Sequence, residues 1–377
     1  MQDLYEDFPE DREVAAFTAV SMLSGATVSQ DDRVLNNFLT ESGTEISMQA
    51  GAIAMDLFRE NPNHPGAAHY IIHSFDHPTY APLALTAAEK YASIAPAVSH
   101  ARHMPTHIFI QHGMWDKVAE WNDSAFQAGW DLWEPGDAAG DQNHSSDWGQ
   151  YGDIQLGHFD RSEMWINRAG DVLANNPGDP RSTGTLKTMK ARHIIETEQW
   201  QTYELTDSLS SDELLALGLS AANLGDLDLA QSVADRLEAL ASQTPDNTTL
   251  NLISMEVSAL TMFKKGQEEE AIELLMDAIS IAESQSPPRG AASPLKPVHE
   301  LAGDLLLTMG SHENAATLYE ASLGRMANRP RALLGAARSY AGMDDDYNAR
   351  QRYQAFYSLW KDNDIAEIDE TERYLGL

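Results

Sequence analysis

The sequence contains no cysteine among its 377 residues. Disulfide bonds, thiolate-ligated zinc, cysteine-ligated iron–sulfur clusters and thiol nucleophiles are therefore excluded. It also lacks any apolar run of the roughly 18 residues that a membrane-spanning helix requires, so no membrane partner is predicted. The N-terminal stretch MQDLYEDFPEDRE is acidic and has no apolar segment of the signal-peptide type. We therefore expect a cytoplasmic location for the chain as given.

Positive charge is scarce, because 25 Lys and Arg residues stand against 58 Asp and Glu residues and give a formal net charge of −33. Each phosphate contact needs a basic group, so neither a nucleic acid nor an anionic membrane surface is expected as a partner. The charge fits an acidic, solvated surface or a cationic partner.

The alternation typical of β-strands is nearly absent, and Ala- and Leu-rich amphipathic stretches broken by short turns fill the chain. The stretches 214–237, 254–279 and 299–323 share one pattern, in which a central glycine has Gly or Ala seven residues before it and Ala five residues after it. Small residues allow two helices to approach closely, and the central glycine can end the first helix with a positive φ. The positions are Gly218, Gly225 and Ala230; Ala259, Gly266 and Ala271; and Gly303, Gly310 and Ala315.

This pattern resembles the tetratricopeptide repeat (TPR), a helix–turn–helix unit of about 34 residues. Fainter units around Gly25, Gly113, Gly157 and Trp200, with a final unit over 331–360, bring the total to about eight. The resemblance implies an all-α fold, a right-handed TPR-like α-solenoid.

We divide the chain into N-terminal units (1–62), histidine-bearing units (63–180) and C-terminal units (181–377). The repeat spacing stretches at 28–45, 134–146 and 283–297. We interpret these segments as long loops of one solenoid, and domain linkers are the alternative.

Histidines are clustered, since eight of the 13 lie within residues 64–112. His69 and His73 are four residues apart, and so are His103 and His107. On a helix this spacing places two imidazoles on one face, close enough to share a metal ion. The two pairs are themselves 34 residues apart. They therefore occupy equivalent positions in successive repeats.

The repeat register adds further residues to the same face. His100 belongs to it, and in the next unit the equivalent positions are His144, Asp147 and Tyr151. Histidine and aspartate are usual metal ligands, and tyrosine can orient a bound group. Neighbouring helices pack at roughly 8–10 Å, so three consecutive helices can direct these side chains to one ion or a pair of ions.

The alternative is that these histidines form hydrogen bonds along the groove or are core residues bound to backbone carbonyls. Pro105 favours the first turn of a helix, which would make His103 a cap residue. Arg192, Glu300 and Asp304 also fall at groove positions. Arg192 could bind an anionic group, but ion pairing within the array is the alternative for all three.

The histidine segments are similar to those of a widespread bacterial family of His-rich TPR proteins. Its pattern is HPGAxHxxIH, then APxxxHxxHMPSHIF, then an H-x-x-D segment, and this chain has Thr106 where the family outline has Ser. The text SPLKPVHELAGDLLLTMG over 293–310, with His299, Glu300 and Asp304, is also similar. The resemblance implies a fold and a site but no reaction, and relatives often have a further N-terminal segment, sometimes with an export signal. The motif matches are His64, His69, His73, His100, His103, His107, His144 and Asp147.

These residues favour a metal-dependent hydrolase of small esters or phosphoesters, because a bound metal lowers the pKa of water without a Ser or Cys nucleophile. Zinc suits imidazole and carboxylate ligands best, with manganese, nickel or iron as alternatives. Asp147 is the predicted base or a further ligand, and Tyr151 the predicted orienting group. His64, His100, Arg192, Glu300 and Asp304 are predicted to support the site or bind substrate. The predicted metal ligands are His69, His73, His103, His107, His144 and Asp147.

Two other functions fit the same residues. One is a non-enzymatic scaffold that binds a peptide in the groove, with the histidines and acids making polar contacts. The other is metal binding without catalysis, for storage or sensing. No HExxH motif with its built-in base is present, so protease chemistry of that type is not supported.

Overall fold

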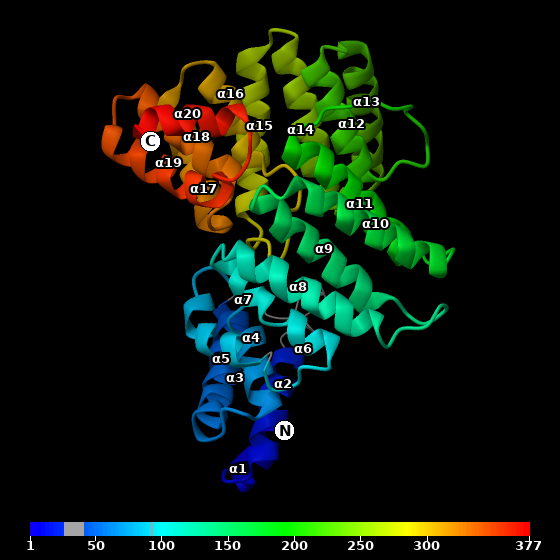
Figure 1. The fold of residues 1–377 in the computed structure, drawn as a ribbon, viewed down its shortest axis with the longest axis vertical. Helices are drawn as coiled ribbons and strands as arrows, with labels where there is room; N and C mark the ends of the chain where they lie inside the picture. The colour runs from blue at the N-terminus through cyan, green and yellow to red at the C-terminus, as the bar shows by residue number, and fades with distance from the viewer. Residues whose placement is uncertain (26–40, 92) are drawn as a thin grey trace. The chain divides into compact units, whose positions relative to one another are not determined.

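The computed structural model describes residues 1–25, 41–91 and 93–377. Every regular element within these ranges is a helix (Figure 1), so the predicted all-α fold is confirmed. Most of the loop expected over 28–45 lies outside the described residues. Among the helices described, none combines the length and the apolar character that crossing a bilayer requires.

The chain forms two compact units, Met1–Glu134 and Pro135–Leu377. The division falls at the start of the segment 134–146, which we interpreted as a loop with a domain linker as the alternative. The divisions predicted at 62/63 and 180/181 fall inside these units. Each unit is described separately below.

The first unit contains eight α-helices and one short 3₁₀ helix within its described residues. They are α1 (Gln2–Asp7), α2 (Arg12–Gly25), α3 (Glu41–Glu60), α4 (Pro65–Ser74), η1 (Ala81–Leu83), α5 (Leu85–Tyr91), α6 (Ser99–His103), α7 (Thr106–Gln111) and α8 (Trp115–Trp130). Helix α3 packs on α2 and α4, and α8 packs on both α6 and α7. The helices that carry the histidine pairs therefore each pack on a longer neighbouring helix.

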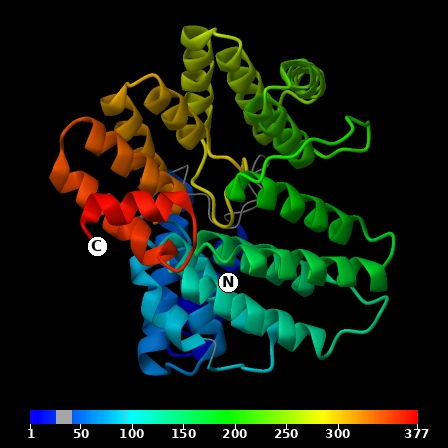
Figure 2. The same ribbon diagram turned by 45° about the horizontal axis from the view of Figure 1, so that its top comes forward.

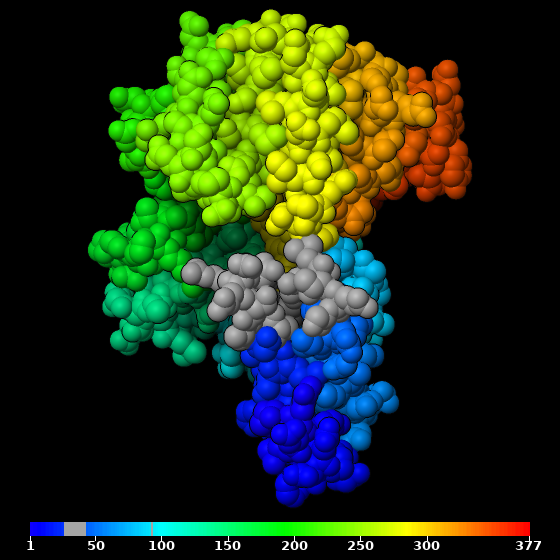
Figure 3. All heavy atoms as spheres, turned by 180° about the vertical axis from the view of Figure 1, so that it is seen from behind, coloured from blue at the N-terminus to red at the C-terminus, as the bar shows by residue number. Residues whose placement is uncertain are grey.

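The second unit consists of α9 to α20, and its successive helices pack on one another in chain order. They are α9 (Gly140–Gln155), α10 (Phe159–Asn175), α11 (Pro180–Thr197), α12 (Ser211–Leu224), α13 (Leu227–Gln243), α14 (Thr248–Lys264), α15 (Glu268–Glu283), α16 (Val298–Thr308), α17 (His312–Arg325), α18 (Pro330–Gly342), α19 (Asp346–Trp360) and α20 (Ala366–Leu375). Figure 3 shows the side-by-side order of these helices on one face of the unit.

The glycine pattern predicts the repeat correctly. Gly225, Gly266 and Gly310 have φ values of 83°, 83° and 76°, the left-handed conformation that ends a helix. Gly218 lies so close to α14 that an added Cβ would be 2.5 Å from a methyl group of Val257. The alternate helices α12, α14, α16 and α18 pack on one another as well as on their neighbours, which is the arrangement of a helical-repeat solenoid.

The helices of the second unit curve until late helices meet early ones (Figure 2). Trp360 on α19 donates from its indole nitrogen to the carbonyl oxygen of Gln155 on α9, at 3.0 Å. The Trp360 ring also packs edge-on against Phe159, with ring centroids 5.5 Å apart. These contacts join residues that are about 200 positions apart in the sequence.

The segment 284–297, between α15 and α16, lies inside this curve (Figure 2). Gly290 contacts the ring of Trp148 on α9 so closely that an added Cβ would be 2.7 Å from it. Ala292 and Leu295 are 3% and 4% exposed. The predicted loop over 283–297 is therefore a packed part of the inner face of this unit.

Candidate metal centre

The first histidine pair lies on α4, in the first unit. His64 is the N-cap of this helix, and its Nδ1 accepts a hydrogen bond from the Ala67 amide at 3.1 Å. His64 therefore caps this helix. The helix then places His69 and His73 one turn apart, with their Nε2 atoms 3.0 Å from each other.

The second pair spans a break between two short helices. Helix α6 ends at His103 with Met104 as its C-cap, and Pro105 is the N-cap of α7. Pro105 therefore precedes the first turn in which we expected it, and His103 is the last residue of α6 rather than a cap. The Thr106 hydroxyl donates to the His103 carbonyl at 2.6 Å, a bond that serine could also form. Despite the break, the Nε2 atoms of His103 and His107 lie 3.2 Å apart.

Hydrogen bonds at Nδ1 assign the tautomers of the second pair. His103 Nδ1 is 2.7 Å from Asn122 Oδ1, and the amide of Asn122 is fixed because its nitrogen donates to the Val118 carbonyl. His107 Nδ1 is 2.8 Å from Asp76 Oδ2, whose second oxygen accepts from Gln111. Both partners are acceptors, so both Nδ1 atoms carry hydrogen. In the neutral rings both Nε2 atoms then present lone pairs.

The separation of the facing nitrogens matches metal coordination. Two nitrogens bound to zinc at about 2.0–2.1 Å lie between roughly 2.9 Å apart at a right angle and roughly 3.4 Å apart at the tetrahedral angle. The observed separations of 3.0 and 3.2 Å fall within this interval. In neutral rings with the tautomers assigned above, His103 and His107 do not hydrogen-bond to each other, and a proton or a metal ion between the two Nε2 atoms would remove the repulsion of their lone pairs.

The two pairs belong to one group of side chains, which we name the histidine cluster (His69, His73, His100, His103 and His107). The rings of His73 and His107 have centroids 6.1 Å apart, and those of His69 and His100 are 5.2 Å apart. Burial, with smaller contributions from His73 and His100, lowers the pKa of His69 from 6.5 to about 3. His69 is therefore neutral at physiological pH, the state that binds a metal.

Sequence reasoning missed Asp76 and Asn122. Asp76 is 2% exposed and Asn122 is fully buried, and each orients one ligand-type imidazole through Nδ1. A carboxylate or amide in this position is characteristic of metal-binding histidines. The sequence offered one signal for Asp76, which is its position next to His77 in the histidine-rich segment HSFDH. No spacing rule connects Asn122 on α8 with His103.

The remaining predicted ligands, His144 and Asp147, belong to the second unit and lie on α9. The His144 ring packs near Trp148, with centroids 5.4 Å apart. Asp147 Oδ1 accepts from Arg192 Nη2 at 2.6 Å, so the ion pair that we kept as the alternative for Arg192 is confirmed. The roles of His144 and Asp147 in a metal site remain predictions.

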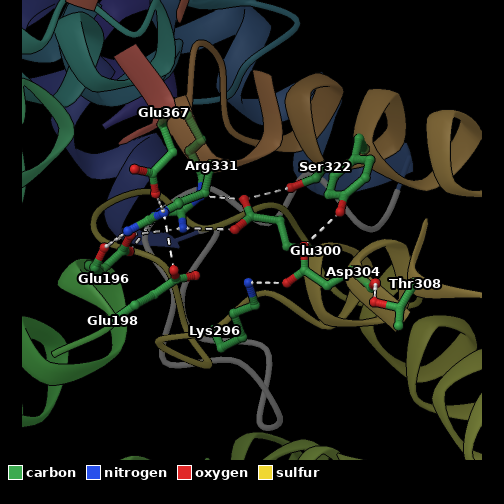
Figure 4. A network of polar contacts seen from close by, with 11 residues as sticks. Glu196, Glu198, Lys296, Glu300, Asp304, Thr308, Ser322, Arg331 and Glu367 are labelled. Carbon is green, nitrogen blue, oxygen red and sulfur yellow. Dashed lines mark hydrogen bonds and ion pairs between the residues drawn. The ribbon is translucent and has the colours of Figure 1, made fainter. Parts of the chain in front are cut away.

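Tyr151 and Glu300 lie in a buried ionic group that we name the Arg329 cluster (Tyr151, Glu196, Glu300 and Arg329). Arg329 is 1% exposed and donates to Glu196 at 3.0 Å, to Glu300 at 2.5 Å and to the Tyr151 hydroxyl at 2.7 Å. Figure 4 shows Glu196 and Glu300, the two carboxylates of this group. Burial raises the pKa of Tyr151 to about 12. The tyrosine is therefore a neutral, enclosed partner of the arginine, and a catalytic role for it remains a prediction.

Asp304 also forms an ion pair. It accepts from Lys296 Nζ at 2.6 Å and from the Tyr319 hydroxyl at 2.6 Å (Figure 4). Lys296 is supplied by the inner segment 284–297. Glu300 and Asp304 therefore both pair with cations of the second unit, which confirms the alternative stated for them.

Glu256 on α14 is fully buried, and neither carboxylate oxygen has a hydrogen-bond partner among the described residues. Burial raises its pKa well above 4.5, while Lys296 lowers it and Glu300 raises it further. A raised carboxyl pKa contributes stability that is present below pH 4.5 and is lost as the pH rises through the folded-state value.

We therefore expect Glu256→Gln to stabilise the second unit increasingly as the pH rises above 4.5, because the amide cannot ionise. Thermal unfolding at pH 6, 7.5 and 9 measures the effect, with an expected gain of a few degrees at the highest pH. The exposed Glu268→Gln change is the control and should show no such trend. A parallel pH dependence of parent and Glu256→Gln proteins would contradict the assignment.

Comparison with known proteins adds little to this geometry. No protein-family model matches the chain, and no curated protein matches it. The human IFIT1 dimer with m7Gppp-AAAA is 10% identical, with a TM-score of 0.41, over 97% of this chain and 71% of that chain. Yeast Tom70 is 13% identical, with a TM-score of 0.36, over 95% and 68%. The TPR domain of P58(IPK) is 12% identical, with a TM-score of 0.28, over 97% and 98%. Likenesses this distant support no inference about ligands or partners.

Proposed function

We propose that the first unit binds a divalent transition metal through His69, His73, His103 and His107. The observation that carries this proposal is the pair of Nε2 atoms 3.2 Å apart whose rings are both held through Nδ1 by buried acceptors. A cation bound between two imidazoles that present lone pairs to each other removes the repulsion between those lone pairs. Anchored Nδ1 atoms and converging Nε2 atoms are the donor arrangement that metals use.

Zinc is the first candidate, because four neutral imidazoles without thiolates suit it well, and manganese, nickel and iron also accept imidazole. The repeat register of the sequence supports His144 as a further ligand. His100 lies within the histidine cluster beside His69. We treat the cluster as one centre that holds one or two ions.

The reaction that we propose to test is hydrolysis of small esters or phosphoesters. A metal held by three or four protein ligands keeps a position for water, whose pKa it lowers toward neutrality. The histidine donor set supports this step, but both predicted auxiliary groups have arginine partners, Asp147 with Arg192 and Tyr151 with Arg329. The proposal therefore relies on a metal-bound hydroxide and assigns no general base to Asp147 or Tyr151.

The decisive experiment is the metal content of untagged protein, measured by elemental mass spectrometry before and after treatment with EDTA. We expect one or two equivalents of metal, removed by the chelator and restored by Zn²⁺. Ester and phosphoester hydrolysis should follow the metal content. Background metal after incubation with Zn²⁺ would overturn metal binding, and full activity in EDTA would overturn the hydrolase alone.

Asp76→Asn should weaken Zn²⁺ binding by about 10- to 100-fold, the usual effect of removing a carboxylate behind a metal-binding histidine. The asparagine preserves size and can still accept from His107, so loss of charge is the main change. Competition titration with a chromophoric chelator measures the affinity. Asp116→Asn on α8 is the control, and equal affinities in the two variants would contradict the role of Asp76.

The second candidate is a protein-binding scaffold, which is the function that a helical-repeat fold supports in general. In the second unit the segment 284–297 already packs on the inner face, with Gly290 against Trp148 and Arg325 donating to the Gln285 carbonyl. A peptide bound there would have to displace this segment. The scaffold function therefore has less support from the inner face of this unit than the metal site has from the histidine cluster.

A further inference from the structure

A cavity of about 390 Å³ lies in the second unit between α10, α11 and the segment 199–210. Its apolar wall includes Ile166, Ile194, Tyr203 and Leu209. This volume lies within the range of small-molecule sites, which are mostly apolar with a few convergent polar groups. One polar group at its wall is His193.

A chain of hydrogen bonds fixes His193 from behind. Arg192 Nη1 donates to Gln150 Oε1 at 2.9 Å, which places the amide nitrogen of Gln150 toward Ser162. That nitrogen donates to Ser162 Oγ at 3.1 Å and to the Met189 carbonyl at 2.8 Å. The Ser162 hydroxyl is 2.9 Å from His193 Nδ1. The Ser162 oxygen accepts from Gln150, and the Ser162 hydroxyl hydrogen is available to the His193 imidazole.

This chain favours the tautomer of His193 in which Nδ1 accepts from the Ser162 hydroxyl. Nδ1 accepts from Ser162, so the neutral ring is protonated at Nε2. Burial lowers the pKa of His193, with an opposing contribution from Glu163. Nε2 lies 3.9 Å from the Glu163 carboxylate, whose side chain is 66% exposed. The ring therefore presents a fixed N–H donor at the cavity wall, beside a carboxylate that is free to turn into solvent.

Lys190 supplies the positive charge at the cavity wall that an anionic ligand would need. Lys190 is exposed at the cavity wall. Glu213 is held at the edge by the Ser210 amide at 2.8 Å and by Lys187 at 3.0 Å, so its charge is compensated. A carboxylate can accept from the His193 N–H and pair with the Lys190 ammonium at the same time. A neutral acceptor would form the hydrogen bond without the charge-assisted contact to Lys190.

We propose that this cavity binds a small organic carboxylate whose apolar body packs against Ile194 and Tyr203 and whose carboxylate accepts from His193 Nε2–H and pairs with Lys190. The site is separate from the histidine cluster, and binding at it requires no metal. His193 showed no clustering in the sequence, because the residues that orient it lie on three different helices.

The test uses 3-phenylpropionate and octanoate, each with its primary amide and its amine, in the presence of EDTA. Isothermal titration measures affinity, and the His193 Nε2–H signal in nitrogen-15 NMR of the parent protein reports contact directly. We expect both carboxylates to bind and to shift this signal, the amides to bind several-fold more weakly, and the amines to bind least.

Lys190→Gln should weaken carboxylate binding about threefold and leave amide binding unchanged, and His193→Phe should weaken both at least tenfold. Lys264→Gln, on α14 of the same unit, is the matched control and should bind as the parent does. Absence of binding by the parent, tighter binding of the amines, or an unchanged His193 signal at saturation would each overturn the proposal. The NMR readout and Lys190→Gln keep it testable if His193→Phe does not fold.

Discussion

His103→Gln/His107→Gln is expected to lower the affinity of the protein for Zn²⁺ by at least about 10³-fold, because metal-site formation supplies apparent free energies of order 10 kcal/mol and half of the proposed ligands are lost. In the parent protein both Nδ1 atoms are held by buried acceptors, so the two Nε2 atoms need no reorganisation before they bind. Glutamine is close to histidine in size and can still donate to Asn122 or Asp76. Loss of affinity would then reflect loss of the ligand nitrogens.

Chelator-competition titration of the variant and the parent measures this loss, with circular dichroism as the check on folding. His158→Ala/His312→Ala removes two histidines of the second unit and is the control for nonspecific histidine binding. It should retain the parent affinity. Tight binding by His103→Gln/His107→Gln, or equal losses in the two double variants, would show that the facing nitrogens do not bind the metal.

A competing proton gives this prediction a pH dependence. Metal and proton compete for the same Nε2 atoms, so Zn²⁺ affinity falls as the pH is lowered through the range in which imidazoles protonate. If the pair His103 and His107 instead shares a proton permanently, the affinity for Zn²⁺ will be weak at every pH. Titrations at pH 6 and pH 8 distinguish the two cases.

Much of the fold could be predicted because helical repeats depend on local signals. The left-handed glycines Gly113, Gly225 and Gly310 stand where the repeat frame requires a turn. The spacing of 34 residues also predicted that equivalent histidines of successive repeats lie near each other, and the rings of His73 and His107 have centroids 6.1 Å apart. Such signals are read within one or two helices, so sequence alone can reveal them.

The residues that sequence reasoning missed act over long separations. Arg329 and Tyr151 are 178 positions apart, and their hydrogen bond depends on how far the second unit curves. The curvature accumulates from small rotations between successive helix pairs, which no short motif encodes. In the same way, Lys296 reaches Asp304 only because the segment 284–297 turns inward. Groove positions inferred from the register therefore did not reveal the partners of these side chains.

Arg329→Met is expected to destabilise the second unit by about 3–5 kcal/mol, because it leaves two buried carboxylates without their cation. Burial alone would lower the pKa of Arg329, but Glu196 and Glu300 raise it well above its ordinary value, so the arginine remains charged. The same arginine lowers the pKa of Glu300 against the effect of burial. At neutral pH the methionine variant therefore carries two uncompensated charges at 1–3% exposure.

Urea unfolding measures the difference, and Arg338→Met is the matched control. Arg338 pairs with Glu370 at 2.7 Å, but its side chain is 40% exposed, so its loss should cost no more than about 1 kcal/mol. Arg329→Met/Glu196→Gln/Glu300→Gln removes the stranded charges and should recover much of the stability lost in the single variant. Similar losses in Arg329→Met and Arg338→Met, or no recovery in the triple variant, would mean that the Arg329 cluster is not what joins the early and late helices of this unit. Recovery would instead show that the arginine is needed chiefly because Glu196 and Glu300 are buried with it.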